Sequence, residues 1–289
     1  MSNKPDHRST PNGPADAGQA LDMPSHRVLP GRRVDLSIID ADTSGPYESA
    51  DDVKAELKRQ RKRITALQER LYAGHRQSLL VVLQAMDTGG KDGAIRGVFE
   101  GVNPQGCQVA SFKAPTPEEL DHDFLWRYHQ KTPGRGMIGI FNRSHYEDVL
   151  IVRVKGLAPD TDWDRRYAAI NAFEQNLSDN GTTILKFYLH ISKDEQKRRL
   201  QSRLNDPEKH WKFDPADLVE RGRWDDYMAA FENAIDACST ATAPWYIVPA
   251  NHKWYRNLVI ARTIADTLEA MDPQFPPAAP KLGQIVIPA

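Results

Sequence analysis

The sequence has few cysteines, almost no net charge and no long apolar run, and each absence narrows what the chain can be. The two cysteines, Cys107 and Cys238, have no metal-binding spacing, so we interpret them as small core residues in a reducing compartment. With a net charge of −1, a polyanion would need a local basic patch, because no overall positive field attracts nucleic acid. Apolar stretches stay below the ~20 residues of a membrane-spanning helix, and the N-terminus lacks the apolar core of a signal peptide. We therefore expect a cytoplasmic protein that binds neither nucleic acid nor a membrane.

The composition is that of an ordinary globular domain with two tails. Of the 289 residues, 40% are hydrophobic and 27% are charged, which suits one large α/β domain with a sizeable core. Residues 1–25 are rich in Ser, Pro, Asn, Asp and Gly and are expected to be disordered, because such a composition cannot bury a core. Residues 273–289 are Pro-rich and are expected to form a second tail, either loose or docked. The folded domain is thus predicted to span residues 26–272.

Apolar strands alternate with amphipathic helices along this domain. Runs of apolar, often β-branched residues predict strands at 79–83, 108–112, 137–141, 183–191 and 245–248. Apolar periodicity and capping residues predict helices at 51–74, 93–102, 162–180 and 251–271, and after Thr116, Ser192 and Asp214. This alternation predicts a parallel sheet with helices on both faces, preceded by a helical N-terminal extension.

The first strand leads into a glycine-rich turn, Asp87-Thr88-Gly89-Gly90-Lys91-Asp92-Gly93, and then into a helix. That order surrounds one point with backbone N–H groups and a helix N-terminus, which together favour phosphate binding. The turn matches the phosphate loop G-x-x-x-x-G-K-[ST] in part, because Ala85 replaces the first glycine and Asp92 replaces the hydroxyl residue. Asp87 and Asp92 would repel a phosphate, so we expect a divalent cation between them and it. Without its flanking elements the turn would be read as an ordinary polar loop.

A second polar motif, Asn142-Arg143-Ser144-His145-Tyr146-Glu147-Asp148, follows the third strand. In phosphate-loop enzymes a strand beside the first one ends in an aspartate that helps to hold the metal, and here Asn142 occupies that strand end. Ser144 and Glu147 have the spacing of a capping box. Capping leaves Arg143 unexplained, because a cation at a helix N-terminus opposes the helix dipole unless an anion binds there. We interpret Arg143 as a phosphate ligand and Asp148 as a further candidate metal ligand.

Two helices joined by a basic loop follow the fourth strand, over about 192–237. Nucleotide kinases carry a mobile lid at this point, whose arginines neutralise phosphoryl oxygens during transfer. The candidate ligands are cations that share one helix face or lie in the loop: Arg199, Arg203, Lys209 and Lys212. The alternative is a solvated basic helix, which we prefer for Lys193 and Arg198.

Several runs, in order along the chain, resemble the polyphosphate kinase 2 family: AMDTGGKDG, GVNPQGCQVASFKAPTPEEL, FNRSHYEDVL, RLNDPEKHWKF and WDDYMAAFENAI. The resemblance covers about residues 30–272, and SHYEDVL is similar to class III members. It implies a thymidylate-kinase-like phosphate-loop fold with a helical lid. It also implies Mg²⁺-dependent phosphoryl transfer, with Mn²⁺ as a substitute, between inorganic polyphosphate and nucleotides. AMP and ADP would be acceptors, ATP a product, and a homo-oligomer (dimer or tetramer) is expected.

The residues and the resemblance together predict a set of site residues. Catalytic roles are predicted for Asp87, Lys91, Arg143 and Asp148, and metal binding for Asp87, Asp92 and Asp148. Phosphate contacts are predicted for Gly89, Gly90, Asp92, Gly93, Asn142, Arg199, Arg203, Lys209 and Lys212. Glu147 stands where the family's residue bears on which nucleotide is accepted.

Polyphosphate offers no base to recognise, so its site should be a basic channel in which positioning and charge neutralisation supply the rate. Two other kinase activities are alternatives: a polyphosphate-dependent kinase restricted to nucleoside diphosphates, and an ATP-dependent kinase of a small molecule. A nucleotide-binding switch or a polyphosphate-storage protein without turnover is a third alternative.

Overall fold

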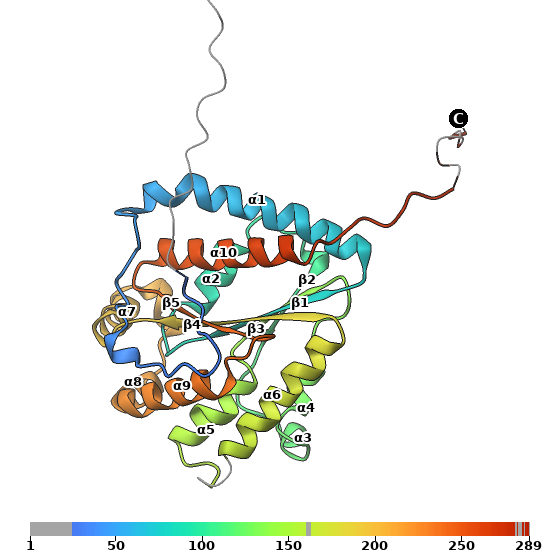
Figure 1. The fold of residues 1–289 in the computed structure, drawn as a ribbon. Helices are drawn as coiled ribbons and strands as arrows, with labels where there is room; N and C mark the ends of the chain where they lie inside the picture. Colours follow the sequence, from blue (N-terminus) through green and yellow to red (C-terminus); the bar gives the residue numbers. More distant parts are fainter. Residues whose placement is uncertain (1–24, 160–162, 281, 283–284, 286, 289) are drawn as a thin grey trace, which may run out of the picture.

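A computed structural model describes residues 25–159, 163–280, 282, 285 and 287–288 (Figure 1). Five parallel strands form one sheet in the order β2-β3-β1-β4-β5. Their bounds are β1 Ser78–Gln84, β2 Cys107–Ser111, β3 Ile138–Asn142, β4 Thr182–His190 and β5 Trp245–Pro249. The central strand β1 is buried along its whole length, which explains why its sequence is a continuous apolar run rather than an alternating pattern.

Helices cover both faces of the sheet (Figure 1). On one face lie α1 Ala50–Gly74, α2 Lys91–Val98 and α10 Lys253–Ala270, with α1 packed along α10. On the other face lie α5 Ile151–Val154, α6 Trp163–Asp179 and α9 Trp224–Cys238. Short elements connect these layers: η1 Leu36–Ile38, η2 Pro104–Gly106, α3 Pro117–Leu120, α4 Trp126–His129 and η3 His145–Val149.

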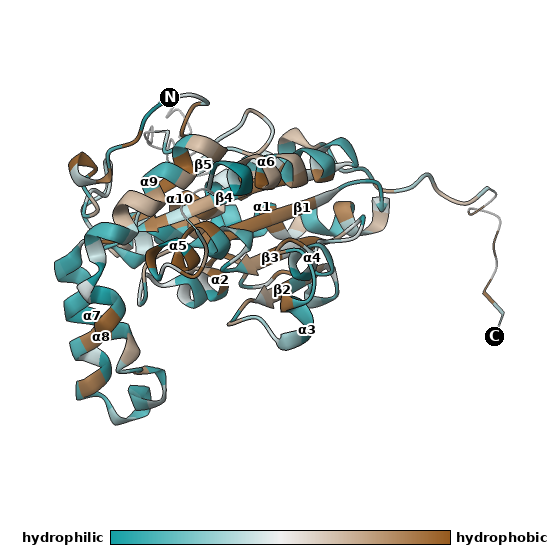
Figure 2. Ribbon diagram, turned by 90° about the horizontal axis from the view of Figure 1, so that it is seen from below, coloured by the Kyte–Doolittle hydropathy of each residue, from teal (hydrophilic) through white to brown (hydrophobic). Residues whose placement is uncertain are grey.

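A helical arm protrudes from the sheet body (Figure 2). It consists of α7 Lys193–Asn205, the 3-10 helix η5 Pro207–Lys212 and α8 Ala216–Gly222. The predicted lid of 192–237 also includes α9, which packs against α5 and α6 on the body. We call the α7–η5–α8 segment the lid below.

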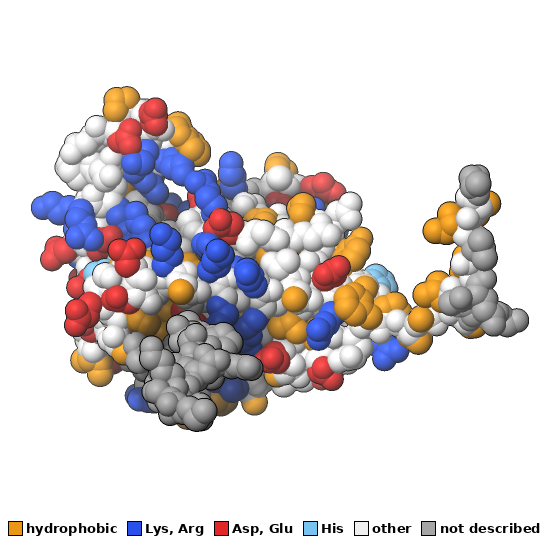
Figure 3. Space-filling model, turned by 90° about the horizontal axis from the view of Figure 1, so that it is seen from above, with side chains coloured by type: hydrophobic (Ala, Val, Ile, Leu, Met, Phe, Trp, Pro, Cys, Tyr) orange, Lys and Arg blue, Asp and Glu red, His pale blue; other side chains and the backbone are white. Residues whose placement is uncertain are grey.

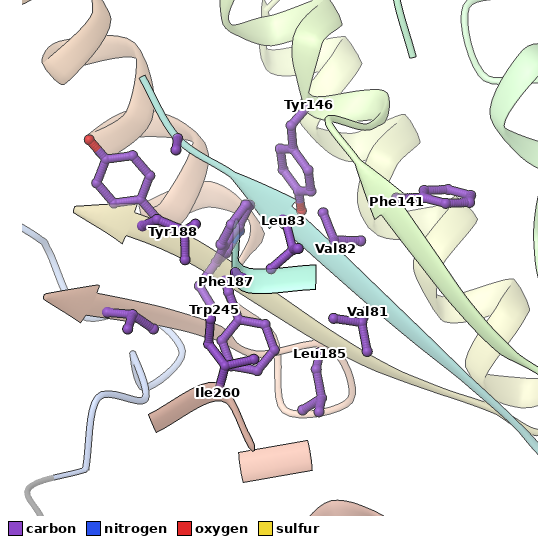
Figure 4. Close-up of a cluster of buried hydrophobic side chains, with 14 of the residues drawn as sticks. Val81, Val82, Leu83, Phe141, Tyr146, Leu185, Phe187, Tyr188, Trp245 and Ile260 are labelled. Atoms are coloured by element: carbon purple, nitrogen blue, oxygen red, sulfur yellow. The ribbon is translucent and has the colours of Figure 1, made fainter. Parts of the chain in front are cut away.

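Aromatic and branched apolar side chains from the strands form the centre of the core (Figure 4). Val81, Val82 and Leu83 of β1 are at most 1% exposed, and Tyr146 of η3 packs edge-on against Trp245 of β5. Burial of each large apolar side chain contributes about 1.5–3 kcal/mol. The strand ends that carry the polar motifs are therefore fixed by a rigid core.

The five predicted strands and the parallel sheet are confirmed, with ends that differ by at most one residue. The single helix expected after Asp214 is wrong, because the chain breaks at Arg223 between α8 and α9. Leu218 of α8 is 52% exposed because the lid stands away from the body. The predicted disordered tail lies outside the described residues except for Ser25. None of the described helices is long and apolar enough to cross a membrane.

Candidate active site

Loops at the carboxyl ends of β1, β3 and β5 face the lid across a cleft of about 1100 Å³. Parallel strands bring these loops to one edge of the sheet, which is where open α/β sheets bind ligands. The lining consists largely of charged side chains and of the glycine-rich turn. Such a cleft suits a charged ligand better than an apolar one.

The glycine-rich turn connects β1 to α2 with a left-handed backbone at two positions. Thr88 has φ 63° and Gly90, the N-cap of α2, has φ 98°. The φ of Gly90 favours glycine, and a Cβ there would also displace the Arg256 guanidinium, because it would lie 2.2 Å from Arg256 Nη1. Lys91 Nζ donates a hydrogen bond to the Ala85 carbonyl across the turn, at 3.1 Å. Burial and then the charge of Arg143 lower the pKa of Lys91, and three nearby carboxylates oppose that shift.

The second motif lies beside this turn because β3 pairs with β1, as predicted. Leu83 stands opposite Asn142 in the register, and Arg143 adopts φ 64° directly after the strand. Arg143 Nη2 donates to Asp87 Oδ1 at 3.1 Å, and Asn142 Nδ2 donates to Asp92 Oδ1 at 2.7 Å. Burial lowers the pKa of Arg143, but the charges of Glu147, Asp87 and Asp217 raise it above its ordinary value. Carboxylates therefore lie beside Arg143, at the point where the sequence predicted a bound anion.

The capping box predicted for Ser144 and Glu147 is wrong. Ser144 Oγ accepts a hydrogen bond from Tyr146 N, and the segment is the 3-10 helix η3 rather than an α-helix. The Glu147 side chain instead lies close enough to Arg143 and Lys91 for their charges to act on it. Burial raises the pKa of Glu147 despite these two cations.

Asp87 and Asp92 line the cleft, whereas Asp148 does not. Asp148 accepts hydrogen bonds from Tyr128 Oη at 2.9 Å and from Arg166 Nη1 at 3.4 Å. Burial raises the pKa of Asp148 to about 6, against these two donors. The structure thus brings together two of the three predicted metal ligands.

An oxygen site with two carboxylates fits Mg²⁺, which usually binds one or two carboxylates together with water and substrate phosphates. Asp87 and Asp92 supply such a pair next to the turn. Within the described part of the chain, no group of three or more His, Cys, Asp or Glu side chains is arranged to hold a metal. A metal here would therefore need oxygen ligands from the substrate as well.

The four predicted lid cations line the cleft but are held in different ways. Arg199 is only 9% exposed, and it donates to Glu195 and to the carbonyls of Thr88, Ala250 and Asn251. Arg203 Nη1 donates to the Lys212 carbonyl at 2.7 Å and to Asp217 at 3.3 Å. Lys209 pairs with Asp206, and the Lys212 ammonium lies over the Trp211 ring. Arg199 thus ties the lid to the phosphate loop.

Further residues line the cleft that the sequence did not single out: Lys113, Asp217, Lys253 and Arg256. Arg256 is 2% exposed, and its Nη1 has no hydrogen-bond partner among the described residues. Burial, and then the charge of Arg199, lower the pKa of Arg256 to about 10. Burial also raises the pKa of Asp217 to about 6, and the charge of Asp87 contributes to this increase. The run NHKWYRN directly after β5 was the available signal, because its cations follow a strand at the same sheet edge.

The charges in the cleft form two groups around different residues. Asp87, Asp92 and Glu147 act on Lys91, and Asp87 and Asp217 act on Arg143. Lys253 instead lies near the cations Arg199, Arg256 and Lys209 and near the carboxylate of Glu195. In Figure 3, Lys and Arg side chains gather between the protruding lid and the sheet body.

The chain is similar to proteins of known activity. The family model described as Polyphosphate kinase 2 (PPK2) matches residues 47–276. The AMP/ADP-polyphosphate phosphotransferase of Meiothermus ruber is 52% identical, over 92% of this chain and 100% of that protein. The ADP-polyphosphate phosphotransferase of Rhodopseudomonas palustris is 46% identical, over 88% and 92%. The crystal structure of Polyphosphate Kinase 2 from Arthrobacter aurescens TC1 matches with a TM-score of 0.87 at 45% identity, over 92% of this chain and 96% of that one.

Proposed function

The chain belongs to the polyphosphate kinase 2 family, and from this premise we propose that it transfers the terminal phosphoryl group of inorganic polyphosphate to AMP and ADP. The products are ADP and ATP. The name of the Meiothermus ruber relative supports both acceptors. The name of the Rhodopseudomonas palustris relative favours a second candidate, in which the acceptor is ADP alone.

The observation that carries the proposal is the meeting of Lys91 and Arg143 with Asp87 and Asp92 at the phosphate loop. Donor and acceptor are both polyanions, so they approach each other only when their charge is neutralised. Lys91 and Arg143 supply positive charge at the reacting phosphates, and the lid cations Arg203, Lys209 and Lys212 supply more from the opposite side. In such sites, charge neutralisation and positioning supply most of the rate.

We propose that the divalent metal of this chemistry is Mg²⁺, with Mn²⁺ as a substitute. Asp87 and Asp92 would hold it, and Asp148 would join only after releasing its hydrogen bond from Tyr128. When bound, the metal neutralises phosphate oxygens and orients donor and acceptor. A phosphate oxygen of AMP or ADP is already a nucleophile at neutral pH, so the chain needs no strong general base.

The grouping of charges in the cleft supports places for the two substrates. The carboxylates near Lys91 and Arg143 suit the metal and the acceptor phosphate. The cations around Lys253 suit the rest of the polyphosphate chain, because polyphosphate is a polyanion. The backbone N–H groups at Gly89, Gly90 and Gly93 would hold phosphates at the turn.

Other assignments follow from family membership. Glu147, next to Arg143, is proposed to influence the choice between AMP and ADP. We also propose a cytoplasmic homo-oligomer, a dimer or tetramer, with a catalytic domain over residues 26–272. Static light scattering on the purified chain would test the oligomeric state.

One assay separates the candidate functions. The protein is mixed with Mg²⁺, polyphosphate and AMP in the absence of ATP, and the nucleotides are quantified by chromatography. Formation of ADP and then ATP is expected. Conversion of ADP but not of AMP would support the ADP-specific candidate. Conversion that requires ATP as donor would support the ATP-dependent kinase, and binding without conversion would support a storage protein or a switch.

A further inference from the structure

A buried polar cluster lies beneath the second motif and takes no part in the chemistry described above. Lys186 of β4 and Glu174 of α6 form an ion pair at 2.5 Å and are at most 1% exposed. Lys186 Nζ also donates to the Tyr146 hydroxyl at 2.8 Å and to the Cys238 carbonyl at 2.6 Å. The other Glu174 oxygen accepts from Tyr146 Oη and pairs with His145 Nε2, both at 3.0 Å. We call Glu174, Lys186, His145 and Tyr146 the buried cluster.

The place of this cluster in the sheet is unusual. Lys186 stands opposite two apolar residues in the sheet register, Val82 of β1 and Trp245 of β5. Removing two charges from water often costs as much free energy as their attraction in the interior provides. A protein with well-packed apolar residues in place of a buried ion pair is therefore frequently as stable or more stable. The need for a stable sheet therefore does not explain the cluster.

The cluster holds the segment that carries Arg143. His145 and Tyr146 begin η3, two and three residues after Arg143, and Ser144, which joins Arg143 to η3, is fully buried. Gln84 at the end of β1 donates to Ser144 Oγ, so the turn is held from both sides. The backbone of Arg143 is left-handed. Residues other than glycine adopt this conformation only when the surrounding structure enforces it. The cluster supplies polar anchors of fixed direction, which apolar packing would not.

We propose that the buried cluster is a positioning device for the reaction, which acts through η3 to hold Arg143 in its left-handed conformation against Asp87. This inference rests on the proposed function. It concerns residues that touch no substrate, so Glu174, Lys186, His145 and Tyr146 are positioning residues. Arg143 would contribute mainly in the transition state, so its displacement should lower kcat rather than raise KM.

The test replaces the ion pair by apolar residues of similar size, in the double variant Glu174→Leu/Lys186→Met. Thermal unfolding is expected to show a folded protein, with kcat reduced on the order of 10- to 100-fold and KM for AMP and polyphosphate nearly unchanged. The same double substitution in an Arg143→Ala background should reduce kcat no further, because the cluster acts through Arg143. The matched control is Ser78→Ala/Thr182→Val. It removes a buried pair of hydrogen-bonded hydroxyls at the amino-terminal ends of β1 and β4, away from the cleft, and should leave kcat unchanged.

Two results would overturn the proposal: a double variant with wild-type kcat, or reductions that multiply fully with that of Arg143→Ala. If the double variant does not fold, Tyr146→Phe removes one hydroxyl from the cluster and is subject to the same criteria. Turnover by the wild-type protein tests the proposed function separately. A wild type that is inactive with polyphosphate would reject that function before any cluster variant is made.

Discussion

Lys91 and Asp87 belong to the same turn, but their side chains are held by different partners. Lys91 contacts the Ala85 carbonyl, and Asp87 accepts from Arg143. Neither side chain belongs to the apolar core, so each can be removed without opening a large cavity. Removing either side chain should therefore lower the rate of the reaction and leave the stability of the fold nearly unchanged.

Lys91→Ala and Asp87→Asn are each expected to reduce turnover of AMP with polyphosphate by at least about 100-fold. Thermal unfolding should remain within a few degrees of the wild type. Lys58→Ala, on an exposed position of α1, is the control and should keep full activity. Near-normal rates in either loop variant would remove that residue from the mechanism.

His26 gives a prediction about pH that is independent of the cleft. It hydrogen-bonds to Tyr255 Oη at 3.0 Å, and its carbonyl accepts from Ile247 N, so residues 26–28 cover the outer edge of β5. Burial lowers the pKa of His26 to about 4. The unfolded chain thus binds a proton more readily, and the stability from His26 is complete above about pH 6.5 and is lost as the pH falls toward 4.

The expected loss between pH 7 and pH 5 is up to about 2 kcal/mol. His26→Gln should flatten this part of the stability–pH curve, as measured by urea unfolding at several pH values. Equal slopes for wild type and variant between pH 5 and pH 7 would contradict the assignment.

At the scale of elements, helix α7 carries two neighbouring arginines in different surroundings. Arg199 connects α7 to the loops at the sheet edge, whereas Arg198 faces solvent. Arg199→Ala would leave the carbonyls of Thr88 and Ala250 without their donor, at a cost of roughly 2–4 kcal/mol in unfolding free energy. We expect kcat to fall as well, because Thr88 belongs to the phosphate loop.

Arg198→Ala is the matched control. Its side chain is 75% exposed, so stability should change by less than about 0.5 kcal/mol, and equal destabilisation of the two variants would refute this view of the lid.

Elements with a strong local signal could be predicted from the sequence. The central strand was predictable because both faces of β1 are buried, which leaves a continuous apolar run. The position of Asn142 beside the loop followed from the usual neighbour of a first strand. The break at Arg223 was missed because α8 and α9 together continue one periodic pattern, and only their different surroundings separate them.

The role of a residue inside an element was harder to predict. Arg256 lies in the periodic pattern of α10, where an arginine suggests a solvated face. Its burial against Gly90 depends on how α10 crosses α2, which local sequence does not encode. The same is true of Lys186 and Glu174, whose contact joins a strand to a helix.

At the scale of the whole molecule, the cleft, the lid and the sheet lie within residues 25–272. The described part of the C-terminal tail leaves α10 and extends away from the body (Figure 1). A chain shortened to residues 25–280 should therefore keep its turnover within about twofold and its unfolding temperature. A large loss of either would show that a terminal segment contributes to the domain.

The central claim is that Asp87, Lys91 and Arg143 neutralise two phosphate chains at one point of the cleft. A crystal structure with Mn²⁺ and adenosine 5′-(β,γ-methylene)triphosphate, which links acceptor and transferred group, tests it most directly. We expect an anomalous Mn²⁺ peak between Asp87 and the phosphates, with Lys91 and Arg143 at about 3 Å from phosphate oxygens. An ordered ligand with all three side chains directed away from every phosphorus atom would contradict the account.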